Sequence, residues 1–515
     1  MKEQKNGINL EKLKGKEWTI IAGVIFAVTV VITALLLFKV VGLDMLPTKY
    51  VILVIGMLVL VLAAVFAAFF LLPLKKKETK YIIRGIAMLL AVVLVVVDIV
   101  GIQMVNKFEN TVSDMVDNKD EPKVEEYQIG VYVRTKDKAT TLEDAKRYDF
   151  GYSLAFDSNN IQTAINMMEN ELDRNLELEE FASVSEAVDA VLSKEKDALI
   201  ISEEYFDVIE GQEGYENLSE QIKCIHTCVV TIEIEVSEKE ETPLVVTKDA
   251  FIVYLSGFDT TRNVKRANSD VNILAVVNPT TKQVLLLNTP RDYYVPISIS
   301  DKGTLDKLTH CGVYGVDCSI DTLNEFYDID ISYYAQINFS GFVKLIDAIG
   351  GITVYSEKDF QVAEDIKFHK GDNHVNGIQA LAFVRERKLF GDGDNARGRH
   401  QMVVIKAIIS KLLSGSLLTN YADILDSMGK SFRCDITQEE ISALVKMQLG
   451  DMAQWNIQSY AVVGDGDGEL NYTYTMPKRK VYVMPPDKAS VEHAKKLIKM
   501  VYDGEIIDSD DLKYK

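Results

Sequence analysis

The chain has 515 residues, enough for two or three domains, and its formal net charge is −20. This acidity argues against nucleic acid as the main partner and fits a solvated surface outside the cell.

Three long apolar runs near the N-terminus predict three transmembrane helices. They cover residues 18–38, 50–74 and 85–105, and only Asp98 interrupts the third run. Because about 20 helical residues cross a bilayer, each run is long enough to span the membrane. We expect Asp98 to reach the outer interface, although a charged residue within a span is also a candidate for function.

The placement of lysine and arginine predicts the orientation of these spans. Five lysines precede the first run, and five basic residues lie between the second and the third. Only two basic residues, Lys39 and Lys49, lie between the first and second runs. Because basic loops stay in the cytoplasm, residues 1–105 form a cytoplasmic N-terminus with three spans, and the chain beyond about residue 106 lies outside.

The next part of the chain is predicted to be a stalk followed by a small domain. Residues 106–126 are polar and acidic, as in a stalk. Residues 127–236, which we name the accessory module, alternate strand patterns such as "YQIGVYVR" with helical patterns such as "NNIQTAINMMENELDRN". We therefore expect an α/β accessory module whose ligand could be a small molecule, a glycan or a protein.

Residues 248–505 are predicted to form a larger α/β (α+β) domain with a mixed central sheet flanked by helices. Strands are expected in "DAFIVYLSGFD", "DVNILAVVN" and "QVLLLNTPRD", with a hairpin turn at "NPTTK" between the last two. Helices are expected in "NFSGFVKLIDAIGG" and "GRHQMVVIKAIISKLL".

All five cysteines lie in the part of the chain that is predicted to be external, where disulfides can form. We expect a disulfide between Cys311 and Cys318, with Cys318 to Cys434 as the competing pair. The six histidines show no zinc-site spacing.

An arginine cluster stands out in the segment "FVRERKLFGDGDNARGRHQ" at 383–401. Arg385 and Arg387 are two apart, so on an extended segment they would share one face. Arg397 and Gln401 are four apart and would share one face of the first turns of a helix. Guanidinium groups suit phosphate oxygens, so the cluster predicts an anion site. The alternative is a solvated basic loop.

Further charged residues lie at strand ends, where α/β folds place ligand groups. They are Asp259 after the first strand of the large domain, Arg266 and Asp270 at the start of the second, and Arg291 after the third. Carboxylates beside arginines and phosphate suit Mg²⁺, which takes few protein carboxylates. Each aspartate alone could instead be a turn residue or a helix cap.

These motifs resemble those of the LytR-CpsA-Psr (LCP) family of Gram-positive bacteria. The resemblance spans about 248–415 and includes "NTPRDYYV", "KLTHCGVYG" and "FVRERKLFGDGDNARGRHQ" in the family's order. The three spans and the accessory module are similar to those of capsule-type members. The resemblance implies an extracellular LCP domain at 248–505 in a multi-pass protein of the cell membrane.

The resemblance also implies a function. Family members are phosphotransferases that move a cell-wall glycopolymer, such as a capsular polysaccharide or a teichoic acid, from a polyprenyl-pyrophosphate carrier to peptidoglycan. The acceptor is commonly the 6-hydroxyl of N-acetylmuramic acid, and Mg²⁺ or Mn²⁺ assists. Expected partners are therefore the lipid-linked glycan, peptidoglycan and the lipid bilayer, with capsule-assembly proteins as further candidates and no nucleic acid.

Residue roles follow by matching the family's motifs. The residues expected to grip the pyrophosphate are Arg266, Arg291, Arg385, Arg387, Arg397 and Gln401. Asp259 and Asp270 match the metal-associated aspartates, and either could take the acceptor proton, so Asp259, Asp270 and Arg291 are the expected catalytic residues. Arg399 and the cysteine-bearing "HCGVYGVDCS" depart from the family pattern.

Two other functions stay open at this point. A polyprenyl-pyrophosphate pyrophosphatase would use the same anion site with water as the acceptor. A non-catalytic regulator of envelope synthesis would hold a lipid phosphate without turnover. The polyprenyl chain also needs an apolar pocket, which the helices containing "FVKLIDAI" and "VVIKAIISKLL" could line, unless their apolar residues are ordinary core.

Overall fold

The structure is a computed structural model that describes most of the chain. The described residues are 15–72, 77–116, 123–154, 157–210, 215, 217–234, 244–258, 267–300, 303–386, 389–390, 394–416, 424, 432–465 and 468–513. The chain divides into two compact units. One comprises Met1–Asp114 with Thr437–Ala453, and the other comprises Met115–Ile436 with Gln454–Lys515.

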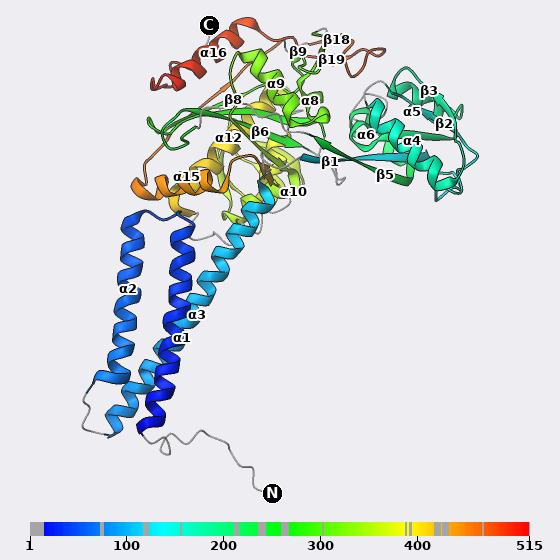
Figure 1. The fold of residues 1–515 in the computed structure, drawn as a ribbon. Coiled ribbons are helices and arrows are strands. Elements are labelled where there is room, and N and C mark those ends of the chain that lie inside the picture. Colours follow the sequence, from blue (N-terminus) through cyan, green and yellow to red (C-terminus); the bar gives the residue numbers. More distant parts are fainter. Residues whose placement is uncertain are drawn as a thin grey trace. The chain divides into compact units, whose positions relative to one another are not determined.

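The first unit contains three apolar helices, as the sequence predicts (Figure 1). They are α1 (Gly15–Gly42), α2 (Thr48–Phe66), which continues as the π-turn η2 (Ala67–Leu71), and α3 (Lys77–Met115). Each is long and apolar enough to cross a membrane. A small core of Trp18, Ala22, Val65, Phe69, Ala87 and Ala91 joins them.

The position of Asp98 corrects the expectation that it reaches the membrane interface. Its side chain is fully buried, and Thr33 Oγ1 of α1 donates a hydrogen bond to Asp98 Oδ2 at 2.5 Å. A buried carboxylate is costly unless it is hydrogen-bonded. The side chain therefore turns toward a hydroxyl on a neighbouring helix.

Two further features of this unit differ from the expected domain plan. Helix α3 continues to Met115, well into the segment that we expected to be a polar stalk. Helix α15 (Gln438–Asp451) groups with the apolar helices, although we expected residues 248–505 to form one domain. Lys446 Nζ lies 2.7 Å from Asp44 Oδ1, in the loop between α1 and α2.

The accessory module is built on a five-stranded sheet with the order β3-β2-β4-β1-β5. Strands β2, β3 and β4 are parallel, whereas β1 is antiparallel to both β4 and β5. The strands are β1 (Lys123–Arg134), β2 (Asp149–Tyr152), β3 (Glu177–Glu180), β4 (Ala198–Ser202) and β5 (Ile222–Ile234). The helices are α4 (Ser158–Leu172), α5 (Val184–Leu192), α6 (Glu203–Glu210) and α7 (Leu218–Gln221).

The larger domain is built on a six-stranded mixed sheet with the order β16-β11-β6-β7-β8-β17. Its strands are β6 (Phe251–Phe258), β7 (Ser269–Asn278), β8 (Gln283–Asn288), β11 (Tyr333–Asn338), β16 (Phe432–Cys434) and β17 (Asn456–Ala461). Strands β6, β8, β11 and β17 run the same way, and β7 and β16 run against them. The carboxyl ends of four strands and the start of β7 therefore share one edge.

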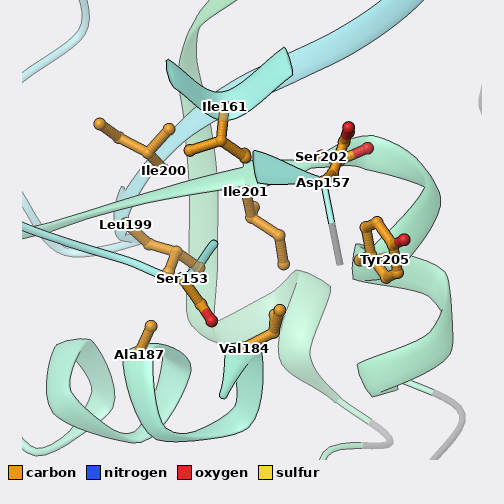
Figure 2. A pocket seen from close by; sticks show the side chains of 10 residues that line it. All are labelled: Ser153, Asp157, Ile161, Val184, Ala187, Leu199, Ile200, Ile201, Ser202 and Tyr205. Atoms are coloured by element: carbon orange, nitrogen blue, oxygen red, sulfur yellow. The ribbon is translucent and has the colours of Figure 1, made fainter. Parts of the chain in front are cut away.

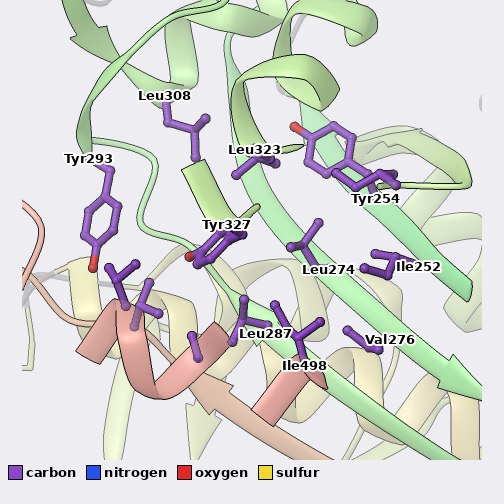
Figure 3. Packing of buried hydrophobic residues seen from close by; sticks show 14 of the residues in the cluster. Ile252, Tyr254, Leu274, Val276, Leu287, Tyr293, Leu308, Leu323, Tyr327 and Ile498 are labelled. Atoms are coloured by element: carbon purple, nitrogen blue, oxygen red, sulfur yellow. The ribbon is translucent and has the colours of Figure 1, made fainter. Parts of the chain in front are cut away.

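Helices cover both faces of this sheet (Figure 1). One face packs on α8 (Leu308–Tyr314), α9 (Val316–Tyr327) and α16 (Lys488–Tyr502). Figure 3 shows this core, where Tyr327 and Ile498 lie over the strand residues Leu274, Val276 and Leu287. The opposite face carries α12 (Asp394–Lys411), which ends in the π-turn η3 (Leu412–Ser416). This layering confirms the predicted fold class.

The remaining elements are short hairpins and two helices. The strands are β9 (Tyr294–Pro296), β10 (Leu305–Lys307), β12 (Ile352–Ser356), β13 (Phe360–Ala363), β14 (Ile366–Phe368), β15 (Gly371–Val375), β18 (Glu469–Asn471) and β19 (Val481–Val483). The helices are α10 (Phe339–Ala348) and α11 (Gly377–Arg385). Helix α10 is followed by Gly350 and Gly351 at φ 77° and 76°, which confirms the glycine stop signal.

The cysteines correct the disulfide expectation, because all five are free thiols. Cys311 on α8 and Cys318 on α9 are both buried. A hydrogen bond with Cys318, together with burial, raises the pKa of Cys311. Hydroxyl groups also contact the pair, with Thr322 Oγ1 3.6 Å from Cys311 Sγ and Ser298 Oγ 3.8 Å from Cys318 Sγ.

The accessory module shares a hydrophobic cluster with the larger domain. Tyr205 of α6 contacts Tyr314 of α8 edge to face, with ring centroids 6.0 Å apart. Lys478 Nζ lies 2.6 Å from Glu186 Oε1 at the same interface. Apolar packing and an exposed ion pair therefore join the accessory module to the larger domain, and both belong to one compact unit.

Candidate functional site

The candidate site lies at the shared edge of the six-stranded sheet. Asp270 is the second residue of β7, and Arg291 follows the end of β8 by three residues. Because β7 is antiparallel to β8, these two positions meet at the edge. The sequence placed both residues at strand ends, and the sheet order brings them together.

Arg291 is held between two carboxylates. Its Nη1 lies 2.6 Å from Asp270 Oδ1, and its Nε lies 3.6 Å from Asp292 Oδ2. Lys307 at the end of β10 approaches Asp292 from the other side, with its Nζ 3.1 Å from Asp292 Oδ1. Two cations and two carboxylates thus alternate along this part of the edge.

The surroundings of Asp292 keep its side chain ionised. Burial alone would raise the pKa of Asp292, but Lys307, Arg291 and Arg397 outweigh burial and lower it overall. Among the residues that the structure describes here, three cations, Arg291, Lys307 and Arg397, thus lie with two carboxylates, Asp292 and Asp270.

Helix α12 brings Arg397 and Gln401 to the same place, which agrees with their predicted common helix face. Both side chains are buried, and Gln401 Nε2 lies 3.4 Å from the backbone oxygen of Asp270. Gly398 allows this approach, because a Cβ there would lie 2.3 Å from Asn288 Nδ2 at the end of β8. A glycine inside a helix costs about 1 kcal/mol relative to alanine, so close packing explains its presence.

Arg385 corrects the expected extended segment. It is the last residue of α11, which begins with a capping box formed by Asn376 and Gln379. Its guanidinium carbon lies 5.0 Å from the ring centroid of Phe339, directly after β11. Since β11 pairs in parallel with β6, Arg385 lies at the same sheet edge as Asp270, but two strands away from it.

Three predicted site residues, Asp259, Arg266 and Arg387, lie outside the described residues. In the sequence, Asp259 directly follows the end of β6, and Arg266 precedes the start of β7 by three residues. Arg387 follows two residues after the end of α11. Their roles stay predictions.

Sequence reasoning missed Lys307. It lies in "KLTH", immediately before α8, and nothing in its spacing marks it as a partner of Asp292. Its position is fixed by Asp306, whose fully buried carboxylate accepts hydrogen bonds from Thr475 N at 2.8 Å and from the Lys307 backbone N–H at 2.7 Å. The signal that could have identified Lys307 was its positive charge directly before the "LTHC" motif.

The two helices that we expected to line an apolar pocket for a lipid tail are α10 and α12. Leu345 and Ile346 of α10 and Val404 of α12 are buried in one core cluster, whereas Phe342 and Ile408 are partly buried against it. The fully buried members favour the alternative of ordinary core. The pocket itself stays a prediction that rests on the partly buried residues.

Arg399 lies apart from the cluster of Asp270, Arg291, Asp292, Lys307, Arg397 and Gln401. Its Nε is 3.6 Å from Glu357 Oε1, and both side chains are more than one third exposed. Exposed pairs of this kind contribute about 0–1 kcal/mol. Arg399 therefore makes a useful control for the buried arginine next to it.

Comparison with known proteins shows to which family the chain belongs. The LytR_cpsA_psr family model matches residues 211–486. A polyisoprenyl-teichoic acid–peptidoglycan teichoic acid transferase TagU from Oceanobacillus iheyensis is 34% identical over 237 residues, which are 45% of this chain and 72% of the relative. The enzyme of the same name from Bacillus mycoides is 33% identical over 227 residues, 44% of this chain and 73% of the relative.

Solved structures give a weaker likeness. The crystal structure of B. subtilis TagV has 26% sequence identity and a TM-score of 0.43, covering 50% of this chain and 99% of that one. The structure of TagT bound to LI-WTA has 26% identity and a TM-score of 0.41, covering 53% and 94%. The family match, which extends over more than half of the residues, decides the assignment: the chain belongs to the LytR-CpsA-Psr family.

Proposed function

We propose that this protein is a membrane-anchored phosphotransferase that moves a glycopolymer from a polyprenyl-pyrophosphate carrier to peptidoglycan. The observation that carries the proposal is the convergence of Arg291, Arg397, Gln401 and Asp270 at one sheet edge. The names of the relatives favour a teichoic-acid-like polymer over a capsular polysaccharide.

The positive edge binds the pyrophosphate. A diphosphate carries several anionic oxygens, and arginine forks can donate paired hydrogen bonds to them. Arg291 and Arg397 share a neighbour, Asp292, because both lower the pKa of its side chain. Arg385 extends the site along the same edge, and Arg266 and Arg387 add to it if their predicted roles hold.

The reaction is a single displacement at phosphorus. The acceptor hydroxyl oxygen attacks the phosphorus that carries the glycan and forms a new O–P bond, and the bond to the carrier's other phosphate breaks. Polyprenyl phosphate leaves with the bonding electron pair, and Asp270 or Asp259 takes the hydroxyl proton. The arginines stabilise the charge on the transferred and leaving phosphates.

The residues at the edge fit a Mg²⁺ or Mn²⁺ ion that is completed by the substrate. Among the described residues, no group of three or more His, Cys, Asp or Glu side chains could hold a metal ion by itself. Mg²⁺ often takes one or two protein carboxylates and fills its other positions with phosphate oxygens and water. Asp270 and Asp259, which lie eleven residues apart in the sequence, would hold the ion. When bound, the ion would screen the negative charge of the phosphates.

The membrane orientation is part of the proposal. The charge distribution favours a cytoplasmic N-terminus, which would place both α/β domains outside the cell with their peptidoglycan acceptor. An enzyme reporter fused after Lys515 should be active outside, and one inserted within residues 75–80 should be active only inside. The reverse pattern would separate the site from its acceptor and refute the proposal.

The activity itself is tested with the full-length protein in detergent, a polyprenyl-pyrophosphate-linked glycan and a peptidoglycan fragment. We expect a phosphodiester-linked product that forms only when the acceptor is present. Release of glycan phosphate at the same rate without the acceptor would favour the pyrophosphatase. Binding of the lipid without any turnover would favour the non-catalytic regulator.

A further inference from the structure

Helix α8 is bound to the sheet edge that carries Asp270 and Arg291, which we name the arginine edge. In the first turn of α8, the backbone N–H of Thr309 donates to the carbonyl oxygen of Arg291 at 2.8 Å. The backbone N–H of Leu308 donates to the carbonyl oxygen of Tyr293 at 2.9 Å, and both of these side chains enter the core in Figure 3. N–H groups at a helix start need acceptors outside the helix, and the segment around Arg291 supplies them. The backbone of Arg291 is therefore tied to α8.

The same helix sets Lys307 and the start of β7. Lys307 directly precedes α8, and its Nζ lies 3.1 Å from Asp292 Oδ1. Gly312 of α8 lies so close to β7 that a Cβ there would be 2.4 Å from the backbone oxygen of Ala267, three residues before Asp270. One short helix therefore contacts three separate segments of the arginine edge, and a shift of α8 would disturb all of them.

A buried carboxylate fixes the place where α8 begins. Asp306 of β10 is fully buried, and each of its oxygens accepts two hydrogen bonds. Oδ1 accepts from the backbone N–H of Lys307 and from His310 Nδ1, both at 2.7 Å. Oδ2 accepts from the backbone N–H of Thr475 at 2.8 Å and from the hydroxyl of Thr475 at 2.5 Å. These four donors offset the cost of burying the carboxylate.

The ionised state of Asp306 determines the direction of these hydrogen bonds. Burial alone would raise the pKa of Asp306, but His310 and Thr475 outweigh burial and lower it overall. Because an ionised carboxylate only accepts, His310 carries a proton on Nδ1 and the Thr475 hydroxyl donates. The Thr475 oxygen then accepts from Tyr314 Oη, 3.0 Å away on the last residue of α8. Asp306 is thus joined to the first turn of α8 and to its end.

We propose that Asp306 is a positioning residue that holds α8, and with it Lys307 and Arg291, in the geometry that binds pyrophosphate. His310 and Thr475 are its partners in this role. The inference rests on the proposed function, because it takes the arginine edge as the pyrophosphate site. Since the protein itself occupies the acceptor positions of the carboxylate, Asp306 acts through the neighbouring cations and not by contact with the substrate.

The test compares two substitutions of one partner. Thr475→Val keeps the shape of the side chain and removes the hydroxyl, whereas Thr475→Ser keeps the hydroxyl. The full-length protein in detergent is titrated with inorganic pyrophosphate in the presence of Mg²⁺, and glycan transfer is measured on the same samples. Thr475→Val should weaken pyrophosphate binding about threefold to tenfold and slow transfer about tenfold to a hundredfold, as a small misplacement of binding groups does. Thr475→Ser should stay near the wild-type values.

A double-variant cycle shows whether the effect passes through the cation. In a Lys307→Ala background, Thr475→Val should change pyrophosphate binding by a smaller factor than in the wild type, because one group that the network positions is already absent. A purely structural role would give the same factor in both backgrounds. His310→Phe, which removes the Nδ1 donor, should weaken binding as Thr475→Val does, and it decides the matter if Thr475→Val fails to fold.

Asn278→Ala is the matched control. Asn278 is buried at the opposite end of β7 from Asp270, and its Nδ2 donates to the backbone oxygen of Val501 at 2.8 Å. This variant should lower the melting temperature and leave pyrophosphate binding by the folded protein unchanged.

The outcomes separate this inference from the proposed function. If the wild type binds no pyrophosphate, the proposed function fails and the positioning role fails with it. If the wild type binds pyrophosphate, and folded Thr475→Val and His310→Phe bind it equally well, the positioning role alone is overturned. Equal factors in the two backgrounds of the cycle would also overturn it, because the network would then act on stability only.

Discussion

The two α/β sheets of this protein place polar groups at equivalent positions, but with opposite charge. At the edge of the six-stranded sheet, Arg291, Lys307 and Arg397 surround Asp292. At the edge of the accessory module's parallel strands, Ser153, Ser202 and Asp157 surround a small cavity (Figure 2). In both cases the residues lie at or just after strand ends and on neighbouring helices.

The difference shows what sheet topology decides and what it leaves open. Topology brings strand ends together and so fixes where a ligand can bind. The side chains at those ends then decide the charge of that ligand, because a cluster of guanidinium groups favours an anion whereas a carboxylate does not. Changes at one edge should therefore leave the other edge intact.

The largest expected effect comes from removing charge at the arginine edge. Arg291→Ala should lower glycan transfer by about thirtyfold to several thousandfold, because loss of a charged hydrogen-bond partner in a site that the bound substrate closes to water costs roughly 2–5 kcal/mol. Arg385→Ala should also lower transfer, whereas Arg399→Ala should retain nearly wild-type activity because Arg399 pairs with Glu357, apart from the cluster. Transfer at wild-type rate by folded Arg291→Ala and Arg385→Ala proteins would contradict the assignment of this edge.

The second effect concerns the metal ion. If the proposed metal assistance is correct, chelation should reduce transfer at least tenfold and added Mg²⁺ or Mn²⁺ should restore it, because a bound ion would screen the phosphate charge. Asp270→Asn should raise the metal concentration needed for half-maximal activity. Full transfer activity in metal-free buffer would rule out the metal-assisted mechanism.

A third effect tests the close approach of α12 to β8. Gly398→Ala should lower stability by about 1–3 kcal/mol, as overpacking does, because the new methyl group meets Asn288. The melting temperature of the full-length protein in detergent measures this loss. The double variant with Asn288→Ala should recover part of it. An unchanged melting temperature for Gly398→Ala would show that the two segments separate without cost.

The smallest effect is a pH dependence at the same helix. Burial, together with Arg399, lowers the pKa of His400, which packs against Phe383 with ring centroids 4.4 Å apart. The unfolded chain then takes up a proton below about pH 6.5 that the folded protein resists, so stability falls as pH falls. The decrease should not exceed about 1.4 kcal/mol per pH unit.

His400→Phe supplies the control for this pH effect, because it keeps an aromatic ring and removes the titrating group. Melting temperatures at pH 7.5 and 5.5 should differ less in this variant than in the wild type. An identical pH dependence in both proteins would assign the effect to other groups.

Much of the large domain could be predicted because its signals are local. The alternating patterns of β7 and β8, the turn between them and the glycines after α10 each occupy only a few residues. Strand β3 was missed because its residues, Glu177–Glu180, are acidic and mostly exposed at a sheet edge. The extended geometry expected at Arg385 was wrong because a capping box nine residues earlier starts a helix.

The site was predicted in part, since motif spacing identifies residues but not their partners. Asp270, Arg291, Arg397 and Gln401 lie together as expected, and Arg385 lies farther along the edge. No spacing rule links Asp292 to Lys307, because a separate hairpin brings them together. The disulfide between Cys311 and Cys318 was expected from proximity in sequence, which does not determine bonding.

The ion pair between Arg291 and Asp270 has a consequence for selectivity and product release. An incoming anion must replace a carboxylate that lies 2.6 Å from the guanidinium. Free orthophosphate would gain little by this exchange, whereas in the proposed mechanism a metal-bearing diphosphate would engage Arg291 and Asp270 together. After transfer, the remaining lipid monophosphate competes with Asp270 alone. We expect this competition to limit product inhibition and to return the edge to its resting state after each turnover.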